Sequence, residues 1–474
     1  MKKNRLAFIA LLLNASVAMA GGILTNTNQS VHFLRNPARD ASTEIDAAYT
    51  NPAGLTKLKH DGFHFSFNNQ SAFQTRTITS TFSPYYYSGG NTTKEFEGKA
   101  SAPIIPSLQG AYKKGKWVLS GAIAVSGGGG KATFNNGLPS FEAGMSMLPV
   151  IIATKVGPNV PGGMTANKYS VDAYMKGSSF IYGAQLGGSY EINEMFSVYG
   201  GFRLNIVNNG YEGYLRNLKS NPTSPAFGYD GSMIDTSPII DIAISQANDD
   251  EKAMLGLLKK ASTSEGVQLD CDQSGWGVSP IVGFNFSYGN LNIGAKYEFK
   301  TSLDVENNTK KDDTGMFKDG VNTPHDIPAL LTIGASYKII PQLTANIGYH
   351  HFFDSDAGMA DGKEKHAGAS NEYLAGLEFQ IDRMFMVSAG GQITRYGVKD
   401  EYQKDLSFSC DSYSIGFGGA VNVSPTVKIN IGYFWTTYSD YTKEPGGGIG
   451  SVVTEKDVFS RTNKVFGAGV DFRF

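Results

Sequence analysis

The sequence is poor in charge, in cysteine and in long apolar runs, and each shortage excludes a class of protein. After residue 20, no apolar stretch reaches the roughly 20 residues that a membrane-spanning helix needs, so we expect no helical membrane anchor. Charged residues make up 18% of the chain, below the usual quarter, and the net charge is −2. Since no sustained basic run occurs, the charge pattern gives no indication of nucleic-acid binding.

Catalytic motifs are missing as well. None of the seven histidines lies in an H-E-x-x-H motif or pairs with cysteines at zinc-finger spacing, and no G-x-S-x-G motif occurs. His350 and His351 are adjacent at the outer end of a predicted strand, where neighbouring side chains face opposite sides, so we interpret them as ordinary rim residues. The sequence therefore predicts no enzyme, no cofactor and no metal site.

The first 20 residues have the pattern of a secretory signal peptide. Basic residues at positions 2, 3 and 5 precede an apolar run over residues 6–13, and Ala-Met-Ala at 18–20 supplies the small residues of a cleavage site. The mature chain then begins at Gly21, and since this residue is not cysteine, we expect no lipoprotein anchor. The protein is predicted to be exported.

Two cysteines remain in the exported chain, Cys271 and Cys410. An oxidising compartment permits a disulfide between them, and two separate thiols are the alternative. Their spacing in the sequence leaves both possibilities open.

From residue 62 onward, apolar and polar residues alternate along successive segments. In residues 291–300, one phase is apolar and the other is polar, and the apolar phase consists of Leu291, Ile293, Ala295, Tyr297 and Phe299. Residues 343–349 and the last residues of the chain repeat this period of two. A period of two indicates β-strands with one apolar and one polar face.

The connections between these segments alternate between short and long. Short ones lie at 113–115, 193–194, 289–290, 341–342, 382–383 and 424–425, and long ones at about 83–93, 127–170, 217–275, 307–328, 355–370, 398–408 and 439–461. This alternation is typical of outer-membrane barrels, in which short periplasmic turns and long external loops connect an even number of antiparallel strands. We predict an all-β, transmembrane antiparallel barrel of about 14 strands over residues 62–474.

Aromatic residues support the barrel over a soluble β-sandwich, whose strands also alternate. They gather near predicted strand ends, as expected for the aromatic girdles at a membrane interface: Tyr297, Phe299, Tyr337, Tyr349, Tyr433 and Trp435. The chain also ends in Phe474, which resembles the C-terminal signature that the outer-membrane barrel assembly machinery reads. The predicted location is the outer membrane of a Gram-negative bacterium, in contact with its lipid.

Residues 21–61 show neither strand alternation nor a sustained helical stripe. The sequence Asn-Pro-Ala occurs twice, at 36–38 and at Asn51, Pro52 and Ala53. Proline removes a backbone donor, and the small residues around it allow close packing. We predict that this segment, which we call the hatch, plugs the lumen of the barrel. The alternative is a flexible N-terminal tail.

Two other stretches need an explanation. Apolar residues lie within the long connections, most clearly Ile239, Ile240, Leu255 and Leu258, and residues from 249 onward have the pattern of a short amphipathic helix. They either pack over the barrel mouth or form an apolar ligand groove. The second stretch is a run of glycines after a good strand, Gly127, Gly128, Gly129 and Gly130, which predicts either a bulge or bend in the wall or a flexible external loop.

The sequence resembles the FadL family of outer-membrane transporters for hydrophobic compounds. The main match is ASTEIDAAYTNPAGL at residues 41–55, with weaker matches at 106–112, 275–278, 293–297 and 327–329, so the resemblance spans nearly the whole mature chain. It implies a monomeric barrel of 14 strands whose external loops capture a hydrophobic molecule, first of all a long-chain fatty acid. It also implies a hatch beside the ligand site and a kinked third strand that opens the wall sideways, here at Gly127 to Gly130. The seventh strand departs from the family pattern, because Glu298 follows Tyr297 where an Arg is common.

Two cations on the polar phase are candidate ligand-binding residues, Arg203 and Lys296. Each would face the lumen and meet a carboxylate headgroup, or else form an ion pair with a lumenal acid such as Glu298 or Glu378. Other functions remain open: a general diffusion porin, or a surface receptor for another hydrophobic ligand such as an aromatic hydrocarbon or haem. A porin needs neither a hatch nor apolar loops.

Overall fold

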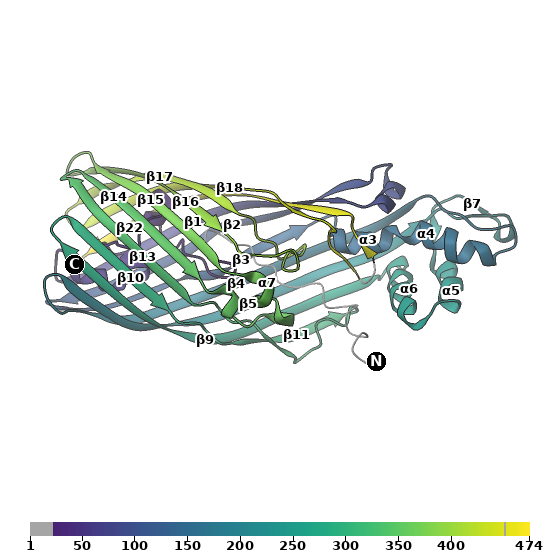
Figure 1. Ribbon diagram of the computed structural model, residues 1–474, viewed down its shortest axis with the longest axis horizontal. Coiled ribbons are helices and arrows are strands. Elements are labelled where there is room, and N and C mark those ends of the chain that lie inside the picture. Colours follow the sequence, from purple (N-terminus) through teal and green to yellow (C-terminus); the bar gives the residue numbers. More distant parts are fainter. Residues whose placement is uncertain (1–21, 450–451) are drawn as a thin grey trace.

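The computed structural model, which describes residues 22–449 and 452–474, is a closed antiparallel β-barrel of 14 strands (Figure 1). The predicted signal peptide, residues 1–20, lies outside the described residues. In chain order the wall consists of β1 (Gly62–Thr81), β2 (Thr93–Lys114), β3 (Trp117–Phe134), β4 (Tyr169–Glu191), β5 (Phe196–Ser220), β9 (Val267–Tyr288), β10 (Leu291–Glu298) continued by β11 (Asp304–Asp312), β12 (Asn322–Pro324) followed by β13 (Leu330–Ile340), β14 (Leu343–Phe352), β15 (Ser370–Gln380), β16 (Phe385–Arg395), β17 (Ser412–Ser424), β18 (Val427–Tyr438) continued by β19 (Tyr441–Lys443), and β22 (Lys456–Arg473). Pairing of β1 with β22 closes the wall.

The strands differ from the predicted ones mainly at their outer ends. β3 continues to Phe134 and β9 already begins at Val267, whereas the sequence placed residues 127–134 and 267–275 in external loops. Glycines and acidic residues in these segments are typical of loops. The backbones nevertheless remain hydrogen-bonded to a neighbouring strand, β3 to β4 and β9 to β5. Hydrogen bonding between strands therefore overrode the local composition.

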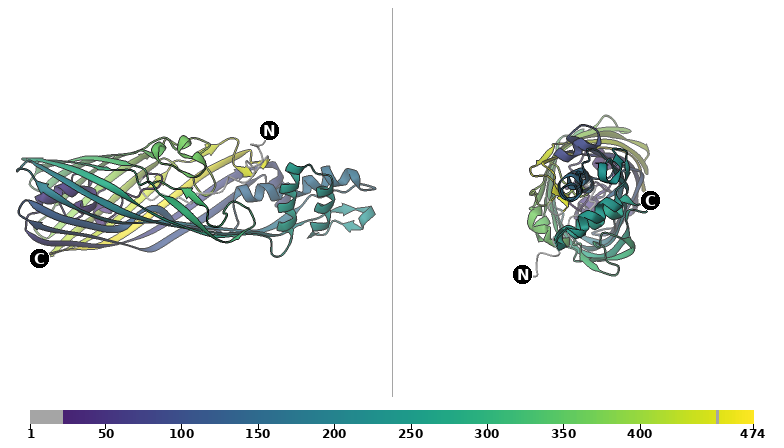
Figure 2. Two further views of the ribbon diagram at one scale, coloured as in Figure 1. Left: turned by 90° about the horizontal axis from the view of Figure 1, so that it is seen from below. Right: turned by 90° about the vertical axis from the view of Figure 1, so that its right-hand side faces the viewer.

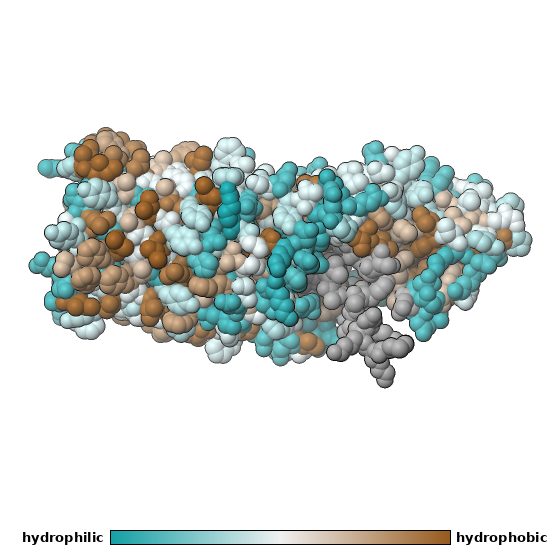
Figure 3. All heavy atoms as spheres, in the orientation of Figure 1, coloured by the Kyte–Doolittle hydropathy of each residue, from teal (hydrophilic) through white to brown (hydrophobic). Residues whose placement is uncertain are grey.

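On the face shown in Figure 3, apolar side chains gather on the half that carries the short turns. Phe67, Tyr337 and Ile431 are each more than half exposed there, while Ser66 and Asn68, on either side of Phe67, are buried inside. An apolar outer band around a polar interior is the arrangement of a barrel in lipid, and the closed wall excludes the β-sandwich. Every helix in the described part of the chain is too short or too polar to span a membrane.

The hatch fills the lumen at the end with the short turns, where the purple N-terminal segment lies inside the barrel (Figure 1 and Figure 2). Nearly all of residues 22–58 are buried, and their regular parts are short: α1 (Val31–Arg35), α2 (Ala47–Thr50) and the 3-10 helix η1 (Pro52–Lys57). Ser30 begins α1, since its Oγ accepts a hydrogen bond from the amide of Phe33. The prediction of a plug in the lumen is confirmed.

The other end of the barrel carries long loops with helices and small strand pairs. These are η2 (Ser83–Ser88), α3 (Pro139–Ser146), α4 (Leu148–Ile151), η3 (Ile152–Val156), η4 (Gly157–Asn159), β6 (Thr223–Ser224), η5 (Pro225–Phe227), β7 (Tyr229–Asp230), β8 (Ile234–Asp235), α5 (Ser237–Ser245), α6 (Asp249–Ser262), η6 (Asp354–Asp356), η7 (Ala360–Gly362), α7 (Glu364–Ala367), β20 (Gly448–Ile449) and β21 (Val452–Val453). The amphipathic helix that we expected from residue 249 is α6. Helices α3 to α6 and the apolar residues packed around them form what we call the external cap.

Candidate functional site at the hatch and the barrel wall

The barrel wall is interrupted between β2 and β3. Their pairing runs from Lys114 and Trp117 to Leu108 and Ile123, stops, and resumes at Ala100 and Ala132. Residues 101–107 of β2 thus have no partner on β3, although β2 remains paired with β1 along most of this interval. An interruption of this kind leaves backbone donors and acceptors unpaired, which is costly in lipid unless another group satisfies them.

Proline accounts for the β2 side of this interruption. Pro103 and Pro106 lie in the unpaired interval and carry no backbone N–H, so neither can donate to a ladder with β3. Ile104 between them is 74% exposed, and a bulge in the β1–β2 register falls at residues 70–72 of β1 opposite them. The β2 edge is therefore irregular here and cannot pair over its whole length.

Glycine accounts for the β3 side. The glycine run at 127–130 lies within the strand, and two irregularities in the β3–β4 register fall there, between Val125 and Gly127 and between Gly128 and Gly130. Gly128 and Gly130 have positive φ angles of 78° and 71°, which side chains with a Cβ rarely adopt. The sequence predicted either a bulge in the wall or a flexible external loop, and the structure shows a bulged strand.

The hatch covers the β3 edge at this interruption. Its backbone bonds to β3 in the manner of an added strand: Asn26 N donates to Ser126 O at 2.9 Å, and Gly128 N donates to Leu24 O at 2.9 Å. The side chain of Gln29 donates to Val125 O at 2.9 Å, and Ser107 Oγ donates to Gln29 O at 2.7 Å. Residues 24–29 thus bridge the two separated strands.

This contact requires glycine at position 127. A Cβ placed there would lie 2.2 Å from Leu24 O, a backbone atom that cannot swing aside. Gly127 therefore permits a close approach of hatch and wall, in addition to the bend that the glycine run allows.

The predicted hatch motif, Asn51, Pro52 and Ala53, lies against β4, β5 and β9, the strands that follow β3 around the wall. Asn51 Nδ2 donates to Asn285 Oδ1 at 2.8 Å and to Ser42 O at 3.0 Å, and so joins the hatch to β9. Ser189 Oγ donates to Pro52 O, and Ser197 Oγ donates to Ala53 O. The backbone carbonyls of the motif accept hydrogen bonds from serine hydroxyls of the wall. These bonds hold an irregular backbone in place where no strand pairing is present.

Ion pairs supply the second anchor of the hatch. Arg39 is 4% exposed and donates to Asp46 Oδ2 at 2.7 Å and to Glu378 Oε1 of β15 at 3.0 Å. Arg35 donates to the same Glu378 oxygen at 2.6 Å. Glu44 accepts from Arg39 at 3.0 Å and from Lys428 of β18 at 2.6 Å. The buried charges Arg35, Arg39 and Asp46 are each paired, as low dielectric requires, and Glu44 joins them with its side chain 40% exposed.

The candidate ligand residues Arg203 and Lys296 form ion pairs with a lumenal acid. Both are 3% exposed and lie in the lumen, and both contact Glu298, Arg203 Nη1 at 2.5 Å and Lys296 Nζ at 2.6 Å. Lys296 also donates to Tyr49 O of the hatch at 2.8 Å, and both cations lie over the Tyr49 ring, at 4.5 and 4.6 Å from its centroid. Of the two possibilities that the sequence left open, the structure shows the ion pair with Glu298.

His350 was interpreted as a rim residue, and this interpretation is wrong. It is 2% exposed, and its two ring nitrogens contact Asp40 of the hatch at 2.9 Å and Glu372 of β15 at 2.7 Å. His351 faces the other side, as the alternation predicted, and contacts Asn371. Asp40 is a hatch residue, so the partner that buries His350 is far away in the sequence, and local pattern could not reveal it.

The apolar loop residues Ile239, Ile240, Leu255 and Leu258 come together in the external cap. All four are at most 2% exposed and belong to one apolar cluster with Phe96 of β2, Phe134 of β3 and Leu218 of β5. This cluster is the largest in the described part of the chain and lies at the external mouth of the barrel. Packing over the mouth is thus observed (Figure 2), and the four side chains are enclosed within the cap.

The two cysteines are not joined. Cys271 and Cys410 are both buried free thiols, so the disulfide between them is absent and the alternative of separate thiols holds. Cys271 lies in β9 beside Thr309, whereas Cys410 precedes β17 and packs near Phe459. They contribute to packing as small apolar residues do.

One group of described residues has the composition of a metal site, His32, Glu44 and Asp46, whose ligand atoms lie within 4.8 Å of one another. Both carboxylates already pair with Arg39 and one with Lys428. A cation here would have to displace these positive charges, so the group is better described as part of the hatch ion pairs.

Comparison with solved structures gives the fold a name. A FadL homologue of Pseudomonas aeruginosa superposes with a TM-score of 0.64 at 10% sequence identity, over 96% of this chain and 100% of the other. The chain shares the fold of this FadL homologue, an outer-membrane β-barrel. The toluene transporters TodX of P. putida and TbuX of Ralstonia pickettii follow, with TM-scores of 0.53 and 0.52 at 13% and 14% identity, over 91% and 95% of this chain and 95% and 97% of theirs. No family model matches the sequence, and no curated protein matches it.

Proposed function

We propose that the protein is an outer-membrane channel through which hydrophobic small molecules, long-chain fatty acids first of all, leave sideways into the membrane. The observation that carries the proposal is the interruption between β2 and β3, bridged by residues 24–29 of the hatch. The fold shared with a FadL homologue and with two toluene transporters supports a hydrophobic cargo.

Physical chemistry favours a lateral exit over a straight path down the lumen. A hydrophobic molecule gains about 0.8 kcal/mol per methylene group on leaving water, so an acyl chain prefers lipid to a polar lumen. Below the interruption, the lumen is closed by a hatch with buried ion pairs at Arg39, His350 and Glu298, an environment that disfavours an apolar molecule. Opening the wall should cost the least free energy near Pro103 and Gly127, because β2 and β3 are not paired with each other there.

In this proposal the external cap captures the cargo. Its apolar cluster contains Ile239, Ile240, Leu255 and Leu258 and lies above the lumen, and a molecule that enters among these residues is already out of water. Hatch gating then means release of residues 24–29 from the β3 edge. Arg203 and Lys296 are the cations that a carboxylate headgroup would meet, in competition with Glu298.

The alternatives receive less support from particular residues. A general porin needs an open lumen, whereas in the described structure the hatch is bonded to the wall at Asn285, Glu378 and Lys428. A receptor for an aromatic hydrocarbon shares the apolar cap, and the toluene transporters among the similar structures favour testing such a ligand beside a fatty acid.

A disulfide across the interruption tests the exit. Ser107→Cys with Ala124→Cys occupies the next register position above the pair Leu108–Ile123 and would fasten the wall at its lower margin. Uptake of labelled oleate and of labelled toluene should fall at least fivefold on oxidation and return on reduction. Ala111→Cys with Ser120→Cys, within the paired part of the same two strands, is the matched control and should leave uptake unchanged. Unchanged uptake in a fully oxidised, correctly assembled Ser107/Ala124 variant would contradict exit through the lower margin of the interruption.

A further inference from the structure

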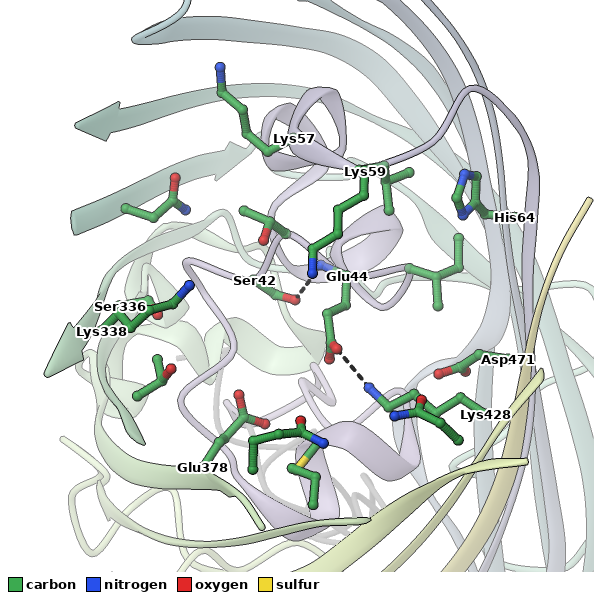
Figure 4. Close-up of a pocket in the computed structure, with 18 of the residues that line it drawn as sticks. Ser42, Glu44, Lys57, Lys59, His64, Ser336, Lys338, Glu378, Lys428 and Asp471 are labelled. Carbon is green, nitrogen blue, oxygen red and sulfur yellow. Dashed lines mark hydrogen bonds and ion pairs between the residues drawn. The ribbon is translucent and has the colours of Figure 1, made fainter. Parts of the chain in front are cut away.

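A cavity of about 1010 Å³ lies below the hatch, at the end of the barrel that carries the short turns (Figure 4). Its wall consists of the lower side of the hatch and of the last inward-facing residues of several strands. It is separate from the interruption between β2 and β3, because none of residues 101–107 or 123–131 lines it. The proposed hydrophobic route therefore leaves this cavity unused.

The charge of the lining is strongly one-sided. Three acidic residues line it, Glu44, Glu378 and Asp471, against seven lysines and arginines: Arg39, Lys57, Lys59, Lys338, Arg383, Lys428 and Arg473. His60 and His64 add two further basic groups.

The three acids already have polar or charged partners within the protein. Glu44 pairs with Lys428 and Arg39, Glu378 pairs with Arg35 and Arg39, and Asp471 contacts His32 at 3.1 Å. Among the basic residues of the lining, Lys57 pairs with Glu191 at 3.1 Å. The internal acids therefore cannot compensate the rest of the positive charge.

Four cations of the lining form no side-chain hydrogen bond and no ion pair with any described residue: Lys59, Lys338, Arg383 and Arg473. Two of them lie on the lumenal phase of their strands. Lys338 follows Ser336 and the buried Thr332 on one face of β13, with Tyr337 on the lipid side. Arg473 follows Asp471 on the inner face of β22, with Phe472 and Phe474 on the other phase. In Figure 4, Lys59 and Lys338 extend into the cavity.

We propose that this cavity binds a small soluble anion with two or more negative charges, such as a di- or tricarboxylate or a phosphate ester. A cleft lined by charge of one sign concentrates counter-ions, and rings of lysine and arginine are the usual device for anions and phosphates in channels. The four cations come from the hatch, β13, the β15–β16 turn and β22, so several anionic groups are needed to compensate them. A lipid headgroup is disfavoured because Lys338 and Arg473 face away from the lipid side.

Calorimetric titration of the purified full chain in detergent at low ionic strength tests the site. Citrate and inorganic pyrophosphate serve as separate probes, and either should bind in one set of equivalent sites. Lys338→Gln with Arg383→Gln should weaken binding at least tenfold. Both side chains are exposed, so the barrel should assemble normally, which heat-modifiable migration on gels checks.

A matched control lies on the same end of the molecule. Lys114, the last residue of β2, and Lys116, in the turn after it, are exposed and do not line the cavity, so Lys114→Gln with Lys116→Gln should bind both probes as the parent does. Binding of citrate alone would support the site and narrow it to carboxylates. The proposal is overturned if the parent binds neither probe, if the control loses as much affinity as the lining variant, or if Lys338→Arg with Arg383→Lys fails to retain binding.

Discussion

The two ends of the barrel are stabilised by opposite kinds of contact. The hatch is joined to the wall by buried ion pairs and amide hydrogen bonds, with Arg39, Asn51 and His350 as the main residues. The external cap is held by an apolar cluster with Leu258 and Phe134 at its interior. Ion pairs and hydrogen bonds are directional and specify one position, whereas apolar packing tolerates rearrangement. The difference suits a plug that must stay in register and, under the proposed function, a cap that accepts molecules of variable shape.

The strongest way to break this contrast is to remove Arg39. Arg39→Ala leaves Asp46 and part of Glu378 uncompensated in a buried site, and breaking a buried pair in this way costs about 3–5 kcal/mol. We expect a loosened hatch in an assembled barrel, and therefore a larger conductance in planar bilayers, approaching that of a chain with residues 22–57 deleted.

Lys155→Ala is the control for that measurement. Lys155 pairs with Glu251 in the external cap, where both side chains are more than a third exposed and screened by water, so its loss should leave conductance unchanged. If Arg39→Ala conducts as the parent does, the ion pairs do not hold the hatch.

A core substitution in the cap should have a smaller and separate effect. Leu258→Ala creates a cavity in the apolar cluster at a cost of about 2–5 kcal/mol, part of which local relaxation recovers. We expect faster proteolysis of the loop containing α5 and α6 on intact cells, with unchanged conductance. Lys252→Ala, exposed on the same helix, is the control. A change in conductance for Leu258→Ala would show that cap and hatch are coupled.

The smallest expected effect is a dependence of cap stability on pH, which arises from Asp405. Burial and the nearby negative charge of Asp457 raise the pKa of Asp405, in the loop between β16 and β17, to about 6, while its Oδ2 accepts from Ser140 N of α3. Because the folded pKa lies above the unfolded value, the folded form binds the proton more tightly. The contribution of Asp405 to cap stability is therefore present below about pH 4 and declines between about pH 4 and 6, by on the order of 1–3 kcal/mol.

Hydrogen exchange of α3 as a function of pH measures this decline. Asp405→Asn keeps an oxygen acceptor for Ser140 and removes the titration, so its exchange should be less dependent on pH in that window. A parent protein whose α3 exchange is equally protected at pH 4 and pH 7 would contradict the assignment.

The strands of the wall could be predicted from the sequence because they depend on residues that are near one another in the chain. A period of two with short turns gives the strand number and the inner and outer faces, as in residues 291–298 and 343–352. The break in the wall had one signal in the sequence, Pro103 and Pro106, because proline cannot donate to a ladder with a neighbouring strand.

The contacts of the site are non-local and could not be predicted in the same way. The bond from Asn26 to Ser126, the contact of Asp40 with His350 and the ion pair of Arg39 with Glu378 each join residues about 100 or more positions apart. A single sequence indicates that a lumenal carboxylate such as Glu298 needs a cationic partner. It does not indicate which cation that partner is. The one-sided charge of the cavity below the hatch likewise depends on strand ends that the barrel brings together.

The closure of the wall by β1 and β22 has a consequence for the order of assembly. The hatch is made first, yet its ionic partners Glu378, Lys428 and Asp471 lie in the last quarter of the chain. Contacts of such sequence separation form slowly, because their loop-closure entropy is lost before they contribute. Until the late strands arrive, Arg35, Arg39 and Glu44 remain in water, so a chain that lacks β22 leaves the hatch without part of its anchorage and the seam at β1 unpaired. Synthesis therefore begins with the segment whose place in the barrel is settled last.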